Sequence, residues 1–386
     1  MKLLNEIKVK STEDLWGLSV KSSQSQSNQS TIETTAQDLA LSFNKSIDDG
    51  LFPDLMKCSK VHVNGTNSQG SEMKMGVSQG SILGPFLFMV YMNDLPFVFE
   101  NQPRMVLFAN DISLIFRVNQ RSSNFNNVNR SICLVQNWFT INNLALNEKK
   151  TKCIKFSLSK VHNNDCDVVL NGQKLEFINE TVFLGITLDT RLQWRPHIKA
   201  LSERLSSVAF EVTDEKTARL HYFSDFHNIM SHDILLWGRA AEIKSIFILQ
   251  KQAIRAIYKL SHRKSLRKFF KTIDILTMPC QFIYENIMYV RKKLQLFEQR
   301  SDGNNFNTSD KNKLVRLSKV QKSFMGLGVQ CYNKIPTNIL DFKESDFETC
   351  IKHGLCKKAY YKVTDYLKDE NAWQYVCPAP PDNTQT

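Results

Sequence analysis

The chain has 386 residues, of which 42% are hydrophobic and 23% charged, so it is long enough for two or three domains and too apolar for a disordered protein. Its 50 Lys and Arg residues against 38 Asp and Glu residues give a formal net charge of +12. This balance favours a polyanionic partner, because release of counterions from phosphates drives binding, although many soluble proteins are also basic. No uncharged apolar run reaches the length of a membrane span, so no membrane partner is expected.

The nine cysteines are scattered and form no C-x-x-C pair. This pattern predicts reduced thiols in an intracellular protein, cytoplasmic or nuclear, and the first ten residues lack a signal-peptide core. Cys350 and Cys356 lie near His353, but their spacing fits no common zinc site. A metal centre is therefore not expected there.

The first 60 residues predict a flexible joint followed by a helix. Residues 22–30 are almost entirely Ser, Gln and Asn, which is typical of a flexible segment. Apolar residues then recur at helical spacing over 32–47, and Gly50 follows as a stop signal. Residues 61–65 next predict a short strand pair.

The most informative stretch runs from residue 76 to residue 116. A glycine-rich turn at 76–85 leads into an apolar run that predicts a buried helix at 86–92. A hairpin follows, with strands at 105–108 and 112–116 and its turn at Ala109-Asn110. The hairpin places the carboxylate of Asp111 at the tip of a buried sheet, where it is costly unless it meets a cation or a donor.

The segments GVSQGSILGPFLFMVYMNDLP and LFANDISLIF resemble the palm of reverse transcriptases from jockey-like non-LTR retrotransposons. The resemblance implies an α/β fold, with an antiparallel palm sheet flanked by helices and then a mostly helical thumb and C-terminal region. It implies RNA-templated DNA synthesis, with an RNA template, a DNA primer and deoxynucleoside triphosphates as partners. Gln79, Gly80 and Ser81 would then lie under the template and the incoming nucleotide.

The same resemblance implies two Mg²⁺ ions bound by hairpin carboxylates, here at Asp111. The family has a second aspartate where this chain has Asn110, whose amide brings no charge to a metal. Because Mg²⁺ favours carboxylates and phosphate oxygens, this change weakens the site. Asn110 is therefore an altered catalytic position, and catalysis by this chain is expected to be impaired.

The resemblance breaks after Lys60, where the family has the first palm strand and its metal-binding aspartate. The break predicts an internal deletion near residues 59–62 that removes an inner strand of the palm. The alternative is that another chain supplies this strand. A palm without an inner strand would expose apolar edges, so poor solubility is expected.

Beyond the hairpin, five large side chains at helical spacing predict a helix between residues 128 and 139, and residues 153–156 predict a strand. Between them, Leu146-Asn147-Glu148-Lys149-Lys150-Thr151 resembles a palm motif in which Lys150 would lie near the nucleotide phosphates. Otherwise Lys150 is a solvated loop residue. Leu170-Asn171-Gly172 predicts a hairpin turn.

Residues 182–189 resemble the primer-grip hairpin of the family, with Leu184 and Gly185 as primer-binding residues. A glycine would let the primer backbone approach closely, whereas the alternative is an ordinary strand with a bulge glycine. Farther on, Lys251, Arg255 and Lys259 recur every four residues on a predicted basic helix. They form either a phosphate-facing surface or a solvated helix face.

These patterns predict four segments: an N-terminal segment with a fingers-entry remnant at 1–60, a palm remnant at 61–190, a helical thumb-like region at 191–300, and a C-terminal helical region with a disordered tail at 301–386. Three functions compete. The chain is an inactive remnant of a mobile element, an active polymerase in which Asp111 and an unrecognised carboxylate gather metal, or a basic nucleic-acid-binding protein without catalysis.

Overall fold

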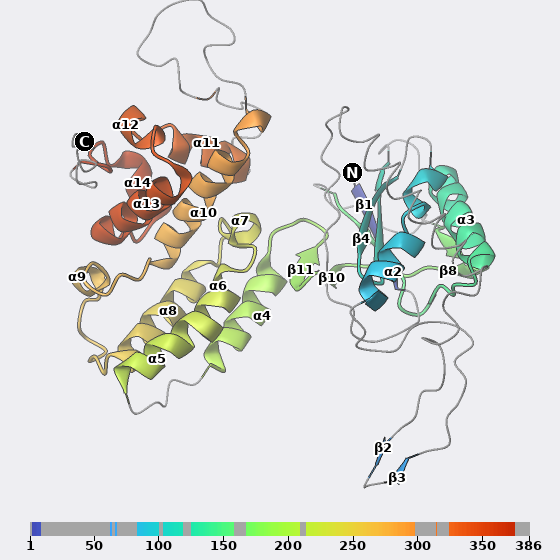
Figure 1. The fold of residues 1–386 in the computed structure, drawn as a ribbon, viewed down its shortest axis with the longest axis horizontal. Helices are drawn as coiled ribbons and strands as arrows, with labels where there is room; N and C mark the ends of the chain where they lie inside the picture. The colour runs from blue at the N-terminus through green and yellow to red at the C-terminus, as the bar shows by residue number, and fades with distance from the viewer. Residues whose placement is uncertain are drawn as a thin grey trace, which may run out of the picture. The chain divides into compact units, whose positions relative to one another are not determined.

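Two units make up the computed structural model, Met1–Thr181 and Val182–Thr386, with strands gathered in the first and helices in the second (Figure 1). The predicted joint at 22–30, helix at 32–47 and proline-rich tail from 378 lie outside the described residues. For residues 2–8, 62–63 and 66–67 the structure gives the backbone alone. The described residues are 2–8, 62–63, 66–67, 83–99, 103–118, 125–157, 167–208, 214–297, 314 and 324–374.

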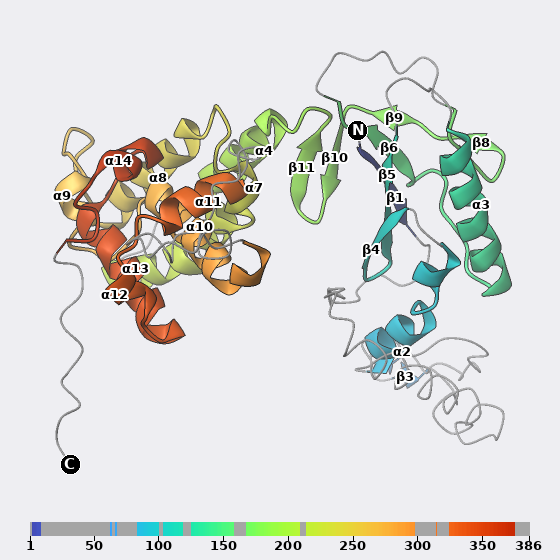
Figure 2. The ribbon, with the colours of Figure 1, turned by 90° about the horizontal axis from the view of Figure 1, so that it is seen from above.

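A five-stranded sheet forms the centre of the first unit (Figure 2). Its spatial order is β4-β5-β1-β6-β9. Neighbouring strands are antiparallel except for the β6–β9 pair, which is parallel. The strands are β1 (Lys2–Lys8), β4 (Arg104–Phe108), β5 (Asp111–Arg117), β6 (Lys152–Lys155) and β9 (Phe177–Ile178).

The predicted hairpin forms at β4 and β5. Phe108 pairs with Asp111, so Ala109 and Asn110 make a two-residue turn, and Ala109 adopts a left-handed φ of 49°. Tight turns of this length require positive φ because it matches the twist of the flanking strands. The chain accepts this conformation at an alanine, where it is less favourable than at glycine.

The inner position of the sheet is held by β1, which comes from the start of the chain. Residues 2–8 pair along their whole length with β5, from Lys2 opposite Arg117 to Lys8 opposite Asp111. On its other side β1 pairs with β6, from Leu3 opposite Lys155 to Glu6 opposite Lys152. The expectation of a palm without an inner strand is therefore wrong, because an unpaired strand edge can be completed by any extended segment that reaches it.

Helix α3 (Asn126–Ile141) packs its apolar side on this sheet. All five side chains that predicted the helix are buried, and they share a core with Ile112, Leu114 and Phe116 of β5. The three β5 side chains alternate along the strand and so belong to one face. The five helix residues are Val128, Ile132, Val135, Trp138 and Phe139.

Helix α2 (Leu83–Tyr91) forms where a buried helix was expected, but it is less buried than predicted. The side chains of Phe86 and Tyr91 are 46% and 45% exposed, whereas Phe88 and the following Met92 contact the core. The sequence is apolar on every side of this helix, so it could not show which face packs against the sheet.

Short elements complete the first unit. Asn171 and Gly172 have left-handed φ values of 47° and 75° and form the hairpin turn that the sequence predicts. Residues 62–67 likewise form a two-stranded hairpin at the predicted strand pair. These elements are β2 (His62–Val63), β3 (Thr66–Asn67), η1 (Leu95–Val98), β7 (Val169–Leu170) and β8 (Gln173–Lys174).

The second unit is mostly helical, and β10 and β11 form a hairpin at its start. Its elements are β10 (Glu180–Phe183), β11 (Ile186–Asp189), α4 (Arg195–Ser206), α5 (Glu215–His221), η2 (Tyr222–His227), α6 (Asn228–Ser231), α7 (Ile234–Trp237), α8 (Lys244–Ile257), α9 (Arg267–Phe270), α10 (Met278–Lys292), η3 (Leu294–Leu296), α11 (Phe324–Tyr332), α12 (Thr337–Leu340), α13 (Glu344–Lys358) and α14 (Val363–Lys368).

Helix α10 lies at the centre of the second unit and is buried along most of its length. Thr277 caps its N-terminus by accepting a hydrogen bond from the amide of Cys280. Gln250 of α8 is fully buried and joins α8 to this end of α10, since it donates to the hydroxyl of Tyr222 and accepts from the amide of Met278 at 2.7 Å. The buried polar groups at this junction thus satisfy one another.

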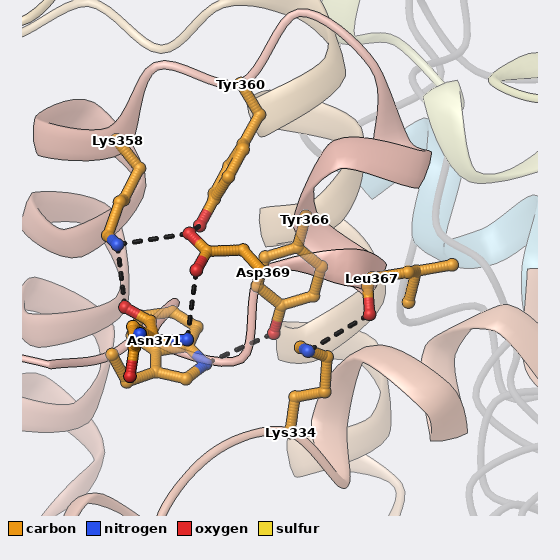
Figure 3. Close-up of polar contacts among 8 residues, drawn as sticks. Lys334, Lys358, Tyr360, Tyr366, Leu367, Asp369 and Asn371 are labelled. Atoms are coloured by element: carbon orange, nitrogen blue, oxygen red, sulfur yellow. Dashed lines mark hydrogen bonds and ion pairs between the residues drawn. The ribbon is translucent and has the colours of Figure 1, made fainter.

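A polar network closes the C-terminal part of the second unit (Figure 3). Asp369 accepts hydrogen bonds from the hydroxyl of Tyr360 at 2.6 Å and from Lys358 Nζ at 3.1 Å. Below it, Tyr366 donates to the carbonyl of Cys331 and accepts from the indole N–H of Trp373. Because these contacts come from several helices, they fix α14 against the rest of the unit.

Two predictions about single residues need correction. Lys259 was expected to continue a helical row with Lys251 and Arg255, but α8 ends at Ile257 and Lys259 follows it with a left-handed φ of 49°. Reduced thiols were expected throughout, yet Cys350 is disulfide-bonded, whereas five other described cysteines are free. None of the described helices is both long and apolar enough for a membrane span.

Candidate active site

The tip of the β4–β5 hairpin carries the two residues expected to be catalytic. Asp111 is the first residue of β5 and Asn110 the second residue of the turn, and both side chains are half-buried. Beyond Asp111, the β5 residues Ile112, Ser113 and Leu114 are all buried. The hairpin therefore presents Asp111 at the end of a rigid strand, with an uncharged amide beside it.

The strand next to Asp111 is β1, and its backbone register can be followed on both sides. By register the Cα partner of Asp111 on β1 is Lys8, whereas the acidic residue Glu6 pairs with Ser113. Glu6 also lies opposite Lys152 of β6. Directly opposite residues are the closest pairs across a sheet, and diagonal neighbours are farther apart, at about 7–8 Å. The register thus pairs Asp111 with a basic residue.

Lys150 lies in the turn between α3 and β6. Its side chain is exposed, and its amide donates to the side-chain oxygen of Asn147 at 3.1 Å. It precedes Lys152 by two residues, at the edge of the sheet where Asp111 begins β5. Since β1 separates β5 from β6, Lys150 and Asp111 are about two strand spacings apart, roughly 10 Å.

The other expected site residues are not brought to this edge by any described contact. Gln79, Gly80 and Ser81 lie outside the described residues. Leu184 and Gly185 form the turn of the β10–β11 hairpin in the second unit, with left-handed φ values of 48° and 84°. A Cβ on Gly185 would lie 3.4 Å from the ring of His232, so the turn itself accounts for this glycine.

The residues at the hairpin do not fit a pair of Mg²⁺ ions. Across the described part of the chain, no group of three or more His, Cys, Asp or Glu side chains is arranged to hold a metal. At the hairpin Asp111 supplies one carboxylate and Asn110 one neutral oxygen, while the strand paired with β5 places Lys8 opposite Asp111. Sites for Mg²⁺ normally combine carboxylates with phosphate oxygens, so one carboxylate and one neutral oxygen make a weak site.

Sequence reasoning missed the contribution of residues 2–8 to the site. These residues mix charged and apolar side chains without the strict alternation of a half-buried strand. Their seven-residue length fits a strand, but only the neighbours β5 and β6 reveal where it pairs. Strand pairing between distant segments leaves little local signal in a sequence.

Comparison with known proteins agrees with the hairpin and the sheet. The family described as reverse transcriptase (RNA-dependent DNA polymerase) matches residues 31–188. A Drosophila melanogaster protein named "Probable RNA-directed DNA polymerase from transposon BS" is 30% identical over 214 residues, which cover 51% of this chain and 24% of that protein. The "RNA-directed DNA polymerase from mobile element jockey" of the same species is 24% identical over 214 residues, or 51% of this chain and 23% of that protein.

A third relative is similar over a shorter part of the chain. The "Retrovirus-related Pol polyprotein from type-1 retrotransposable element R1" of Bradysia coprophila is 26% identical over 169 residues, covering 43% of this chain and 17% of that protein. The chain thus matches 24% or less of the length of these three relatives. The family match over residues 31–188 and these relatives show that this part of the chain is similar to the RNA-directed DNA polymerases of mobile elements.

Proposed function

We propose that this chain is a retrotransposon-derived reverse transcriptase protein whose palm no longer supports efficient RNA-templated DNA synthesis. The observation that carries the proposal is the tip of the β4–β5 hairpin, where Asp111 is the carboxylate at the start of β5. Asn110 adds to it, because the hairpin then holds one carboxylate where two would share the metal charge. One carboxylate cannot balance the charge of two divalent cations.

The internal deletion inferred from the sequence fits this proposal. The segment expected to carry a further metal-binding aspartate is absent after Lys60, and β1 holds the inner position of the sheet. The palm is thereby kept as a folded scaffold, while the groups that the resemblance assigns to catalysis are reduced to Asp111 and Lys150. RNA template, DNA primer and deoxynucleoside triphosphates remain the proposed ancestral substrates.

A primer-extension assay tests the proposal directly. The full chain would be incubated with an RNA template, an annealed DNA primer and deoxynucleoside triphosphates, in Mg²⁺ and separately in Mn²⁺. We expect no incorporation above that of the Asp111→Ala variant. Templated incorporation that is lost in Asp111→Ala would overturn the proposal and support an active polymerase. A thermal unfolding curve for each protein shows that both are folded.

The Glu6→Gln variant addresses the remaining carboxylate on β1. Glu6 is two residues from the register partner of Asp111, and it is the acidic residue of that strand. If the wild-type chain incorporated nucleotides and Glu6→Gln abolished this activity, Glu6 would be the unrecognised carboxylate of an active site. We expect instead that both proteins are equally inactive.

A second candidate function is nucleic-acid binding without catalysis. Residues 244–273 contain nine Lys or Arg residues and no Asp or Glu, in a chain of net charge +12. This segment spans α8 and α9 of the second unit, so a positive surface remains even if the palm is inactive. Affinity for RNA that decreases steeply with salt would support this function, and affinity that ignores salt would exclude it.

A further inference from the structure

One disulfide of the second unit has a partner that lies outside the described residues. Cys350 of α13 is disulfide-bonded, and its side chain is 6% exposed within the core of this unit. Three of the nine cysteines in the sequence lie outside the described residues: Cys58, Cys166 and Cys377. The other five take no part in a disulfide: Cys133, Cys153, Cys280, Cys331 and Cys356. One of the first three is therefore the partner of Cys350.

Cys377 belongs to the same unit as Cys350, whereas the other two possible partners do not. Cys58 and Cys166 lie within Met1–Thr181, and Cys350 and Cys377 lie within Val182–Thr386. Cys377 follows Cys350 by 27 residues, whereas Cys166 precedes it by 184 residues. Because loop closure becomes less frequent with the 3/2 power of loop length, the shorter loop closes about 18-fold more often in an unfolded chain. Both observations favour Cys377.

The chain that leads to Cys377 is anchored beside α13. Lys358, the last residue of this helix, donates from Nζ to Asp369 at 3.1 Å and to the carbonyl of Asn371 at 2.6 Å (Figure 3). Cys350 lies eight residues before Lys358, which corresponds to about 12 Å along the helix. Cys377 is six residues beyond Asn371, and six residues span up to about 20 Å. The chain is therefore long enough to bring Cys377 to Cys350.

Residues 369–374, which we call the 369–374 segment, carry the contacts that close this part of the second unit. The Trp373 side chain is 7% exposed, and its indole N–H donates to the hydroxyl of Tyr366 at 3.3 Å. Tyr366 in turn donates to the carbonyl of Cys331 at 2.9 Å. A disulfide just beyond the segment would hold these contacts in place, because it removes conformations from the unfolded chain.

We propose that Cys350 and Cys377 form a redox-dependent clasp that fastens the 369–374 segment to α13. In the oxidised form, the bond closes a loop that contains the end of α13 and all of α14. In the reduced form, the segment is held only by its noncovalent contacts. The clasp is independent of both functions proposed above, because neither of its cysteines is assigned to catalysis or to nucleic-acid binding.

Opening the clasp transfers two electrons from a thiol reductant such as glutathione. One glutathione thiolate attacks the sulfur of Cys377 and forms a mixed disulfide, and the Cys350 thiolate leaves and takes up a proton. A second glutathione thiolate attacks the glutathione sulfur of the mixed disulfide, which releases the Cys377 thiolate and oxidised glutathione. Closing by oxidised glutathione is the reverse reaction. Attack occurs at Cys377 because the sulfur of Cys350 is buried.

Peptide mapping by mass spectrometry tests the pairing. The full chain is equilibrated with oxidised glutathione, its remaining thiols are alkylated with iodoacetamide, and it is digested with trypsin without a reductant. Because trypsin cleaves after lysine, Cys350 lies in the peptide 344–352 and Cys377 in the peptide 369–386. We expect these two peptides to be joined and to separate when a reductant is added.

Two results of the mapping would overturn the proposal. In the first, Cys350 is recovered in alkylated form, which would show that it is a thiol under oxidising conditions. In the second, the peptide 344–352 is joined to any peptide other than 369–386, which would assign Cys350 a different partner.

The effect of the clasp is measured by thermal unfolding and hydrogen exchange of the full chain with and without dithiothreitol. Reduction should lower the unfolding midpoint of the second unit by roughly 5–10 °C. Amides of the 369–374 segment should exchange about tenfold faster, because the segment opens more often once the bond is broken. Cys377→Ser should give the values of the reduced protein under both conditions.

The matched control is Cys133→Ser, which removes an exposed free thiol of the first unit. It should keep the response of the wild type to dithiothreitol. A wild-type midpoint that is the same with and without the reductant would overturn the clasp. The same conclusion would follow if Cys377→Ser still lost stability on reduction, because another bond would then cause the response.

Discussion

The two units of this protein are held together by different kinds of contact. In the first, the central sheet joins residues 2–8 to residues 111–117 on one side and 152–155 on the other. In the second, Gln250 of α8 satisfies buried groups of neighbouring helices, and α10 packs against α7, α8, α11, α13 and α14. The sheet of the first unit thus depends on one short segment that is distant in sequence from its neighbours, whereas the helical unit is held by many contacts distributed over its length.

This difference predicts that a single backbone change in β1 should unfold the sheet of the first unit and leave the helices of the second unit intact. Leu4 pairs with Ile115 on one side and with Ile154 on the other. Leu4→Pro removes an amide donor from an inner strand, which should cost about 3 kcal/mol or more. Hydrogen exchange measured by mass spectrometry should show β5 losing protection while α10 keeps it.

Leu4→Val is the matched control, because it keeps the amide and favours an extended backbone. It should leave the exchange of β5 close to that of the wild type. If Leu4→Pro had no effect on β5, the inner position of the sheet would not be held by residues 2–8 in solution.

Two glycine substitutions should have the opposite effect, because the larger loss of stability is expected in the second unit. A Cβ on Gly238 would lie 2.4 Å from the ring of Phe282 on α10, so Gly238→Ala should destabilise the second unit by about 3 kcal/mol. Gly172, in the first unit, has open space around it but a φ of +75°. Gly172→Ala should therefore cost only about 1 kcal/mol.

The loss of stability caused by each substitution can be measured by chemical denaturation. Hydrogen exchange then follows the two units separately. The expected result is that Gly238→Ala lowers protection in α10 and leaves β5 unchanged, while Gly172→Ala has the smaller effect and acts on the first unit. Equal costs for the two substitutions would contradict the packing of α7 against α10.

Acid should weaken the second unit through His197, a buried residue whose ring lies between Trp194 and Trp237. Burial lowers its pKa from 6.5 to about 4, with a smaller contribution from His232. The His197 ring is therefore protonated less readily in the folded state than in the unfolded state. Stability is full above pH 6.5 and falls as the pH drops from 6.5 toward 4, by about 2 kcal/mol.

Thermal unfolding of the second unit at pH 7.5, 6 and 5 measures this loss. His197→Phe keeps an aromatic ring but cannot be protonated, so its midpoint should change less with pH than that of the wild type. The control His262→Gln alters an exposed histidine and should leave the wild-type pH dependence in place. An unchanged pH dependence in His197→Phe would show that other groups cause the loss.

The smallest expected effect concerns Asp369 in the network of Figure 3. The hydrogen bond from Tyr360 is the main cause that lowers its pKa, with a further contribution from Lys358. A lowered pKa in the folded state means that the stabilisation is present above the unfolded pKa, near 4, and is lost as the pH falls through the folded value. Asp369→Asn should cost about 1 kcal/mol at pH 7.

Urea denaturation of Asp369→Asn at pH 7 and pH 3 tests this contribution. The difference from the wild type should be smaller at pH 3 than at pH 7, because protonation of the wild-type carboxylate at falling pH removes its stabilisation. Glu370→Gln changes the exposed neighbouring acid and should alter stability by less than about 0.5 kcal/mol. A larger effect of Glu370→Gln would assign the stabilisation to general charge rather than to the network.

Local patterns were sufficient for the elements whose signal lies within one segment. Helix α3 follows from apolar side chains at helical spacing, and both hairpins at Asn110 and Gly172 follow from turn residues between strands. Helix α2 was predicted, but not its exposed side, because its sequence is apolar all round. Lys251 and Arg255 were placed together on one helix, whereas Lys259 lies past the point where that helix ends.

By itself, the sequence determined a hairpin with Asn110 beside Asp111 that resembles the palm hairpin of reverse transcriptases, and a strongly basic segment that follows it. These features are local, so they can be recognised along the chain. Only the tertiary structure decided that residues 2–8 fill the inner position of the sheet and that Lys251 and Arg267 lie beside the ring of Tyr361. Both depend on contacts between distant segments, whose pairing is selected by packing and backbone hydrogen bonding rather than by any local pattern.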